Sequence, residues 1–429
     1  MGDYDRDGLV DLYVTNSAGT NKNLLYHNDG GNKFTKITMG TIVNDISDTR
    51  SVNWVDIDGD GDLDLFVTNE NGKNEQMYRN DNNGIIFTKI AAGPLVSNLG
   101  NTMSSSWADY DNDGDLDVFL TYDGSSNALF RNEGSFNFTK MVSDTVSNTN
   151  AHSFSSAWSD IDNDGDLDLF VTNAFYTLSK QLSFLYLNNG DGSFARVSNT
   201  IPAIESSWSY GCAFGDYDND GFEDLAVATV SFNSIDDVDF LYHNDGNSNN
   251  WITIKLVGTT TNRAAIGCKI RVKATINGKE VWQMREISAQ SAYCSQNDLR
   301  AHFGLGDATS IDSIKVEWLG QATEIFTQIF PNQFITITQG NGILGLDEIS
   351  PYDEMELFPN PAKSILNVKM RGLSAHHSPL FQLIDMKGFL ASSGKIKNAT
   401  IDIQDLSPGM YLLKVAMPGR TMIKRFIKI

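Results

Sequence analysis

Five short aspartate-rich loops carry the residues best suited to chemistry in this chain. Each loop spaces acidic side chains two residues apart around a central glycine, as in Asp56-Ile-Asp-Gly-Asp-Gly-Asp-Leu-Asp64. Carboxylates at positions 1, 3, 5 and 9 of such a loop, with the backbone carbonyl of position 7, supply the hard oxygen ligands that Ca²⁺ prefers. The predicted ligands are Asp3, Asp5, Asp7, Leu9 and Asp11; Asp56, Asp58, Asp60, Asp62 and Asp64; Asp109, Asp111, Asp113, Asp115 and Asp117; Asp160, Asp162, Asp164, Asp166 and Asp168; and Asp216, Asp218, Asp220, Phe222 and Asp224.

These loops predict about five Ca²⁺ ions, because several carboxylates in one tight turn repel one another without a cation. Magnesium prefers a tighter octahedron with retained waters. Transition metals are disfavoured, since no histidine or cysteine accompanies the aspartates within a loop. An EF-hand is excluded because it needs a glutamate at position 12, where the five loops carry apolar residues in strand-like runs, namely Val14, Val67, Leu120, Val171 and Val227.

The loops also account for the acidity of the chain. Its 429 residues carry a formal net charge of −22, and without the loop aspartates the chain would be near neutral. The overall charge and its location argue against nucleic acid and anionic membrane as partners. No apolar stretch is long enough to span a bilayer, and the start at Met1 lacks the pattern of a signal peptide. For an exported protein, we therefore expect further sequence upstream.

The loops belong to a repeat of about 53 residues, since they begin at Asp3, Asp56, Asp109, Asp160 and Asp216. An aromatic residue two positions before the loop, an alternating run after it, an aromatic-X-Asn segment and a Phe-Thr-Lys-type segment recur with the same period. Alternation and turn residues predict four short strands per unit. Four strands in about 50 residues is the content of one propeller blade.

Residues 1–248 thus resemble the FG-GAP/VCBS repeats of integrin-α-like propellers, through loop, flanking aromatic and period together. The resemblance implies an all-β fold with a calcium-loop β-propeller of about five blades, incomplete at its N-terminus. Because the first repeat begins inside its loop, we expect loop one to lack its preceding strand and to be poorly formed.

A second β pattern without aspartate loops occupies residues 249–341, with strand-like runs such as Trp251–Val257 and Ile311–Trp318. It resembles the ASPIC/UnbV module through segments that include Ser295-Gln-Asn-Asp-Leu-Arg300 and His302-Phe-Gly-Leu-Gly306. The resemblance predicts a small β domain and fixes no activity. Arg285, Glu286, Arg300 and His302 could suggest a catalytic cluster, but no nucleophile with a paired base accompanies them, which favours a structural polar network.

Residues 342–351 read as a linker, after which the composition becomes basic. Residues 352–429 resemble the C-terminal sorting domain of type IX secretion cargo, through Phe358-Pro-Asn-Pro361, Leu406-Ser-Pro-Gly-Met-Tyr411 and the terminal Lys424-Arg-Phe-Ile-Lys-Ile429. The resemblance implies an Ig-like β-sandwich, contact with the type IX machinery, and a mature protein that is secreted or held at the outer surface of a Gram-negative bacterium.

The three cysteines are too few for a disulfide framework, and we expect Cys212, Cys268 and Cys294 to be small buried residues; a Cys268–Cys294 bridge stays open. Taken together, the sequence predicts a non-enzymatic calcium-binding propeller that acts in adhesion, with an extracellular glycan or protein as its ligand. The alternative is a polysaccharide-acting lyase or hydrolase, whose site would need a base and a charge neutraliser converging in a groove.

Overall fold

A computed structural model describes residues 1–17, 22–142, 145–174, 179–231, 238–327, 329–344, 355–369, 379–385, 390–397, 399–417 and 420–429. The described chain is built almost entirely of strands, which confirms the all-β prediction. It divides into two compact units: residues 1–217 with 221–344, and residues 345–429, with which the short segment 218–220 is grouped. No described helix is long and apolar enough to cross a membrane.

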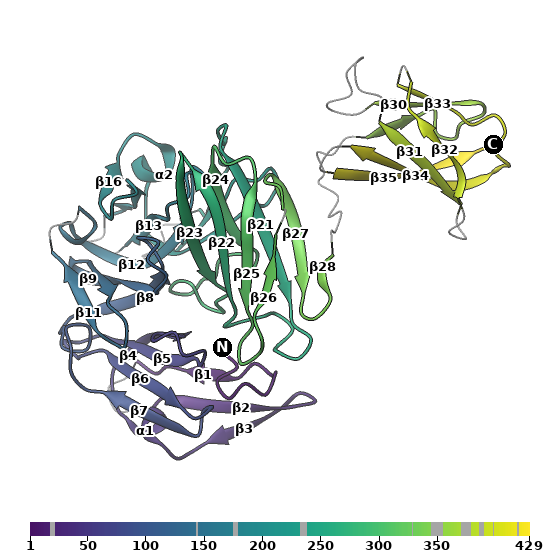
Figure 1. Ribbon diagram of the computed structural model, residues 1–429. Helices are drawn as coiled ribbons and strands as arrows, with labels where there is room; N and C mark the ends of the chain where they lie inside the picture. Colours follow the sequence, from purple (N-terminus) through teal and green to yellow (C-terminus); the bar gives the residue numbers. More distant parts are fainter. Residues whose placement is uncertain are drawn as a thin grey trace. The chain divides into compact units, whose positions relative to one another are not determined.

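Five sets of antiparallel strands follow one another along the first part of the chain, one for each repeat, and those of the third and fourth repeats join in one eight-stranded sheet (Figure 1). Their strands, in order, are β1 (Leu12–Val14), β2 (Leu24–Gly30) and β3 (Lys33–Ile37); β4 (Thr49–Val55), β5 (Asp64–Asn69), β6 (Gln76–Asp81) and β7 (Ile86–Ile90); β8 (Thr102–Ala108), β9 (Asp117–Ser126), β10 (Ala128–Asn132) and β11 (Phe138–Met141); β12 (Asn150–Ser159), β13 (Asp168–Asn173), β15 (Phe184–Asn188) and β16 (Phe194–Val197); and β18 (Ser209–Gly215), β19 (Asp224–Thr229) and β20 (Phe240–Tyr242). The predicted aspartate loops connect β4 to β5, β8 to β9, β12 to β13 and β18 to β19. These sets of strands are therefore propeller blades.

Short elements complete the connections between blades. They are α1 (Thr41–Asn44), η1 (Thr145–Ser147), α2 (Ile201–Ile204), and the paired strands β14 (Gln181–Leu182) and β17 (Ser206–Ser207). The long strands β9 and β12 also pair with each other, so that blades three and four share hydrogen bonds along one edge.

The first strand of each complete blade lies innermost. β4 lies beside β8, β8 beside β12, and β12 beside β18. These strands carry small hydroxyl side chains that permit close approach, and they bond to one another: Ser105 Oγ donates to Asn53 Oδ1 at 2.6 Å, and the hydroxyls of Ser106 and Ser156 lie 2.8 Å apart. The packed axis of the propeller is therefore polar, whereas the spaces between blades hold aromatic and aliphatic side chains.

The module after the blades is a sandwich of two four-stranded sheets, β24-β21-β27-β28 and β23-β22-β25-β26. Its strands are β21 (Asn250–Val257), β22 (Lys269–Ile276), β23 (Lys279–Glu286), β24 (Ala301–Gly306), β25 (Ile311–Glu317), β26 (Glu324–Phe326), β27 (Gln333–Thr338) and β28 (Gly342–Leu344). β28 lies inside the predicted linker 342–351, so the ordered module extends further than expected, and residues 345–351 lie outside the described residues.

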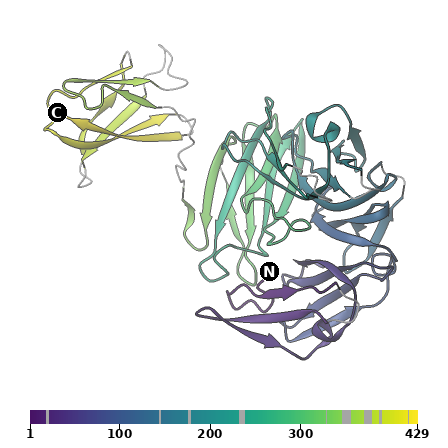
Figure 2. The same cartoon turned by 180° about the vertical axis from the view of Figure 1, so that it is seen from behind.

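The module and the first two blades share one hydrophobic core. Tyr4, Trp54 and Leu63 of the blades belong to the same buried cluster as Ile252 and Phe303 of the module. Figures 1 and 2 show the module beside the N-terminal blades from both sides. Residues 1–248 are therefore not an independent body, although the sequence suggested a separate domain.

The C-terminal unit contains two antiparallel sheets around its own core, β29-β30-β33 and β32-β31-β34-β35. Its strands are β29 (Glu356–Phe358), β30 (Ile365–Lys369), β31 (Leu380–Asp385), β32 (Leu390–Lys395), β33 (Thr400–Asp402), β34 (Gly409–Met417) and β35 (Arg420–Lys428). Buried residues of both sheets, among them Leu366, Leu383 and Phe426, fill the space between them. The unit is a small β-sandwich.

Two of the three cysteines are buried, as the sequence predicted. Cys212 and Cys268 are buried, whereas Cys294 is exposed, and all three are free thiols. The possible Cys268–Cys294 bridge is therefore absent from the described structure.

The shared core predicts different results for two truncations. A chain ending at Leu344 keeps every strand of the propeller and module, and its melting temperature should match that of the same unit in the full chain to within about 2 °C. A chain ending at Ser248 loses the apolar partners of Tyr4, Trp54 and Leu63. Because each large side chain contributes about 1.5–3 kcal/mol when buried, its melting temperature should fall by more than about 10 °C. Circular dichroism melts would show equal stability of the two truncations if the shared core were unimportant.

Candidate metal-binding loops

The backbone of each loop turns twice through the left-handed region. The glycines at position 6 have φ of +91° at Gly8, +90° at Gly61, +97° at Gly114, +105° at Gly165 and +94° at Gly221. Position 4 is also left-handed, with φ between 57° and 74°. Glycine and asparagine tolerate that conformation best, which explains Gly59, Asn112, Asn163 and Asn219 at position 4; Arg6 is the exception.

The aspartate at position 9 ties the loop to its blade. In loop two, Asp64 Oδ2 accepts a hydrogen bond from Ile57 N at 3.0 Å, and Oδ1 accepts one from Asn80 N at 2.7 Å. The same pair of bonds recurs at Asp11, Asp117, Asp168 and Asp224. Loop one makes these bonds, and Gly8 N donates to Asp3 Oδ2 at 3.1 Å, so the expectation that loop one is poorly formed is wrong. The pairing of Gly2 with Asp11 stands in for the missing strand contact.

The asparagines of the aromatic-X-Asn segments, here called the blade asparagines, connect consecutive blades. Their Nδ2 donates to the position-2 carbonyl of the preceding loop: Asn80 to Tyr4 O at 2.8 Å, Asn132 to Ile57 O at 2.9 Å, Asn188 to Tyr110 O at 2.8 Å and Asn244 to Ile161 O at 2.8 Å. The same Nδ2 also reaches the position-8 carbonyl of its own loop. Sequence reasoning recorded these asparagines only as repeat markers, although their constant spacing was the signal for a structural role.

Several loop carboxylate oxygens are buried without any hydrogen-bond partner. They include Oδ1 of the position-1 residues Asp3, Asp56 and Asp109, and Oδ1 of the position-3 residues Asp111 and Asp162. A buried ionised oxygen without a donor or cation is costly. Positions 1 and 3 of these loops thus hold buried carboxylate oxygens that no described protein group satisfies.

The structure brings together carboxylates at positions 1, 3 and 9. In the first three loops one oxygen from each of these residues lies within 4.8 Å of the others, as in Asp56, Asp58 and Asp64. The predicted position-5 residues Asp60 and Asp113 instead accept a hydrogen bond from the backbone N of position 7. Side chains at position 7 reach the neighbouring blade: Asp62 pairs with Arg6, and Asp166 accepts a bond from Asn112 at 2.9 Å.

Burial raises the pKa of the loop carboxyls. The pKa of Asp64 and that of Asp117 rise to about 9, chiefly because both are buried and secondarily because neighbouring loop aspartates repel their ionised forms. The pKa of Asp109 rises to about 7 and that of Asp3 to about 6, again mainly through burial. A cation within the loop would oppose these shifts by favouring the charged forms.

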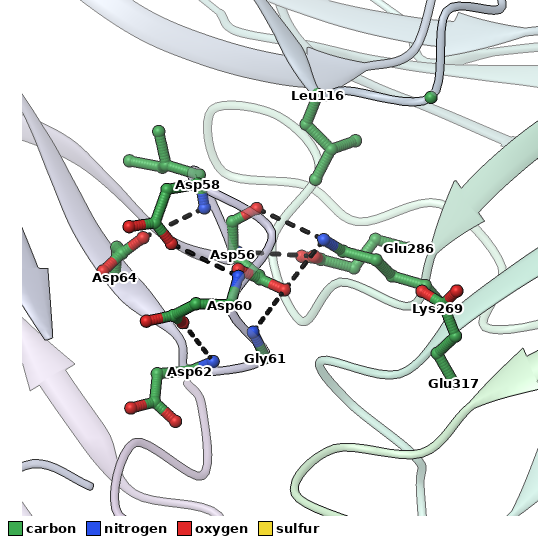
Figure 3. A network of polar contacts seen from close by, with 12 residues as sticks. Asp56, Asp58, Asp60, Gly61, Asp62, Asp64, Leu116, Lys269, Glu286 and Glu317 are labelled. Atoms are coloured by element: carbon green, nitrogen blue, oxygen red, sulfur yellow. Dashed lines mark hydrogen bonds and ion pairs between the residues drawn. The ribbon is translucent and has the colours of Figure 1, made fainter. Parts of the chain in front are cut away.

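The module covers loop two with a buried cation of its own. Lys269 Nζ lies 2.8 Å from Asp56 Oδ2, and both side chains are almost fully buried (Figure 3). Glu286 also lies beside Asp56 and accepts a hydrogen bond from Asp56 N at 3.4 Å (Figure 3). Burial raises the pKa of Glu286 to about 8 despite the nearby Lys269. Asp56 Oδ2 therefore contacts both Lys269 of the module and Gly61 N of its own loop, the latter at 3.1 Å, whereas Asp56 Oδ1 is buried without a hydrogen-bond partner.

The module contacts the other loops as well. Arg271 donates to Gly114 O of loop three at 3.2 Å, and Gly304 N donates to Asp160 Oδ2 of loop four at 3.0 Å. Arg300 donates to Asp216 O of loop five at 2.7 Å. In loop one, Thr260 of the module lies against Gly8, since a Cβ atom placed on Gly8 would be 3.1 Å from the carbonyl oxygen of Thr260. The end of the propeller that carries the predicted metal ligands is thus an interface with the module.

The four residues that could suggest a catalytic cluster lie in this interface. His302 is buried, with Nδ1 2.9 Å from Thr253 Oγ1 and Nε2 2.6 Å from Asn163 Oδ1, and burial lowers its pKa to about 3. Arg300 pairs with Asp298, and Arg285 lies over the ring of Phe303 at 5.0 Å. His302 is therefore a neutral side chain whose two ring nitrogens both lie within hydrogen-bond distance of buried side chains.

A cavity of about 130 Å³ lies between the module and the ends of the innermost strands. Its lining includes Trp54, Trp107, Trp158, Arg285, Glu286 and His302. That volume accommodates a few water molecules, whereas sites for drug-sized ligands occupy about 300–1,000 Å³. The cavity is therefore too small for a sugar chain.

Known families match all three parts of the chain. The FG-GAP-like repeat matches residues 3–67, 56–120, 109–171 and 175–227. The ASPIC and UnbV family matches residues 258–344, and the secretion system C-terminal sorting domain matches residues 356–429. The architecture expected from the sequence motifs is confirmed by these matches.

Full-length relatives show a weaker similarity. Cartilage acidic protein 1 of Mus musculus is 24% identical over 261 residues, which cover 59% of this chain and 39% of that protein. Cartilage acidic protein 1 of Xenopus tropicalis is 24% identical over 359 residues, which cover 80% of this chain and 46% of that protein. The chain spans less than half the length of these two relatives.

Two solved structures align over most of the chain at low similarity. PorZ, a bacterial surface component of the type IX secretion system of Porphyromonas gingivalis, aligns with a TM-score of 0.27 and 12% identity over 95% of this chain and 62% of that one. The extracellular domain of the putative hybrid two-component system BT3049 of B. thetaiotaomicron aligns with a TM-score of 0.33 and 10% identity over 98% and 54%. Neither similarity is close enough to bear on function.

Replacing the buried lysine tests the interface at loop two. Lys269→Met leaves the carboxylate of Asp56 buried without its ion-pair partner, and removing one member of a buried ion pair typically costs about 3–5 kcal/mol. We expect a loss of that size in the free energy of unfolding, measured with urea. Lys273→Met is the matched control, because Lys273 pairs with the exposed Glu280 and should cost less than about 1 kcal/mol. Equal losses in the two variants would contradict a special role for Lys269.

The raised pKa values predict how the metal-free protein responds to pH. Asp64 and Asp117 have a pKa of about 9 when folded, against about 4 in an unfolded chain, so the folded state holds more protons between these values. In EDTA, the stabilisation that these two carboxyls contribute to the folded state should be fully present below about pH 4 and should decline as the pH rises toward 9. The melting temperature in EDTA should therefore fall between pH 5 and pH 8.5. Asp64→Asn with Asp117→Asn should flatten this fall, and an unchanged slope would refute the assignment.

Proposed function

The chain belongs to the FG-GAP-repeat family, and on that premise we propose that it is a calcium-binding β-propeller that acts by binding an extracellular glycan or protein, and not by catalysis. The sorting domain at residues 356–429 indicates export by a type IX secretion system to the outer surface or the extracellular space. Secretion places the loops where free calcium is plentiful. Calcium sites in extracellular modules have affinities of about 0.1–1 mM, which suits that environment.

The observation that carries the calcium proposal is the set of buried carboxylate oxygens without partners. Six such oxygens lie at positions 1 and 3 of four different loops: both oxygens of Asp109, and Oδ1 of Asp3, Asp56, Asp111 and Asp162. Oxygen atoms from positions 1, 3 and 9 already lie within 4.8 Å of one another in the first three loops. The donor set is almost entirely carboxylate and carbonyl oxygen, which favours Ca²⁺ over softer ions.

Calcium in these loops would act as a structural element. Positions 1 and 9 connect to backbone groups of the blade, and the blade asparagines connect each loop to the next blade. An ion that fixes the loop would therefore fix the angle between blades. The module covers this end of the propeller, so a glycan or protein ligand would bind at the opposite end of the blades or along their outer edges.

The polysaccharide-acting alternative has less support from the described residues. The cavity at the interface is too small for a sugar chain, and the one histidine in its lining is neutral with both ring nitrogens engaged. A binding role requires no such group.

A substitution with opposite effects in two buffers tests the calcium proposal. Asp109 is buried in loop three, with both carboxylate oxygens unpartnered. Asp109→Asn removes a buried charge, so it should raise the melting temperature in EDTA. In 2 mM CaCl₂ it should lower the melting temperature, because losing one site with an affinity near ~0.1 mM removes about 1.8 kcal/mol of stabilisation. Metal analysis after dialysis should show one Ca²⁺ ion fewer per chain.

Asp312→Asn provides the matched control, since Asp312 is an exposed carboxylate on the module. It should change neither the calcium content nor the effect of EDTA. Calcium addition that leaves the melting temperature of the native chain unchanged, or a calcium content equal in the Asp109→Asn and native proteins, would refute the proposal.

A further inference from the structure

Loop one has a nitrogen ligand that the sequence reading did not anticipate. His27 lies on β2, and its Nε2 is 3.0 Å from Asp5 Oδ2 and 3.5 Å from Asp7 Oδ2. The three side chains form a group whose ligand atoms all lie within 4.8 Å. The statement that no histidine accompanies the aspartates is therefore wrong for loop one in space, although it is true of the loop sequence.

The imidazole is held in the orientation that a metal ligand requires. His27 Nδ1 lies 3.0 Å from Asp29 Oδ1, and Thr35 Oγ1 donates to Asp29 Oδ2 at 2.7 Å. A carboxylate that accepts the Nδ1 proton leaves the lone pair of Nε2 facing Asp5 and Asp7. Histidines that bind metals almost always donate their second ring nitrogen to such a group.

The distances between the ligand atoms fit a small ion. Zinc binds imidazole nitrogen and carboxylate oxygen at about 2.0–2.2 Å in tetrahedral geometry, so two of its ligand atoms lie about 3.3–3.6 Å apart. The separations of 3.0 and 3.5 Å from Nε2 to the two carboxylates are close to that value. Independently, Asp3 Oδ1 is buried in the same loop without a partner, and Asp3 and Asp5 belong to a second group of close ligand atoms with Asp11.

The corresponding position differs between blades. Blades two and three carry Arg79 and Arg131 after the aromatic residue of the aromatic-X-Asn segment, and each arginine pairs with an acidic residue two positions later. Those blades place a permanent cation where blade one places an imidazole, which can release a proton and bind a metal. Blade four has Leu187 at this position, and blade five has His243. Blade one is thus chemically distinct from blades two, three and four.

We propose that loop one binds a divalent transition-metal ion of the Zn²⁺ class through His27 Nε2, Asp5 and Asp7, with Asp29 as a positioning residue. The inference extends the proposed function, because loop one is one of the five proposed cation sites and would take this ion in place of calcium. Imidazole nitrogen favours zinc and its neighbours over Ca²⁺, which selects oxygen ligands. Loops two, three and four keep their oxygen donor sets for calcium.

Zinc titration of the full chain in 2 mM CaCl₂ tests this assignment. The protein carries His243→Arg, so that blade five cannot supply a second imidazole at the same position. Isothermal titration should detect one zinc site, and His27→Arg, which installs the residue of blades two and three, should weaken it by at least about 100-fold. Asp29→Asn should weaken it by about 10–100-fold, as removal of a supporting carboxylate does in other sites. His152→Asn, which alters a histidine outside the loops, should leave it unchanged.

Zinc X-ray absorption can be measured on the His243→Arg protein itself. This readout therefore does not require the His27 or Asp29 variants to fold. One imidazole among oxygen ligands is the expected spectrum, and an all-oxygen spectrum overturns the proposal. Equal zinc affinity in the presence and absence of His27 also overturns it. Calcium content and the melting temperature in EDTA are measured separately from zinc binding. If calcium binds as expected but zinc does not, this inference alone is refuted. If calcium does not bind, the proposed function is refuted.

Discussion

A buried carboxylate needs hydrogen-bond donors or a cation, and the propeller meets that need in the same way in every blade. The position-9 aspartate accepts one backbone N–H from its own loop and one from the blade asparagine, as Asp64 does from Ile57 and Asn80. The side chain of that asparagine then reaches the preceding loop, as Asn80 reaches Tyr4 O. Each loop is consequently both the turn of one blade and the attachment point of the next.

The module also supplies polar groups that contact the acidic loops of the propeller. It contributes fully or partly buried cations, Lys269 at loop two and Arg271 and Arg300 at loops three and five, at the end where acidic groups are most concentrated. These residues belong to a domain whose sequence motifs predict no activity. Lys269 pairs with a loop carboxylate, and Arg271 and Arg300 donate hydrogen bonds to loop carbonyl oxygens. These polar contacts accompany the hydrophobic core that the propeller and module share.

Local patterns in the sequence were sufficient to predict the loops, the blade strands and half of the module strands, namely β21, β22, β25 and β27. The alternation in residues 63–68 predicted β5, and Trp251–Val257 predicted β21, because both signals depend on neighbouring residues. Contacts between distant segments could not be predicted in this way. Lys269 and Asp56 are 213 positions apart, and no local pattern joins them. His27 is an intermediate case, since its position within the repeat was visible but the direction of its side chain depends on how β2 passes loop one.

Some partners of the first two blades are synthesised long after the blades themselves. Leu63 lies against Gly267, and Asp56 pairs with Lys269, so these groups have no native partner until some two hundred further residues have been synthesised. Loop closure over such a distance is slow, and unpaired apolar faces of early segments are prone to aggregation. The order of synthesis therefore gives this protein a period in which its N-terminal blades are exposed, and that period ends only when the module arrives.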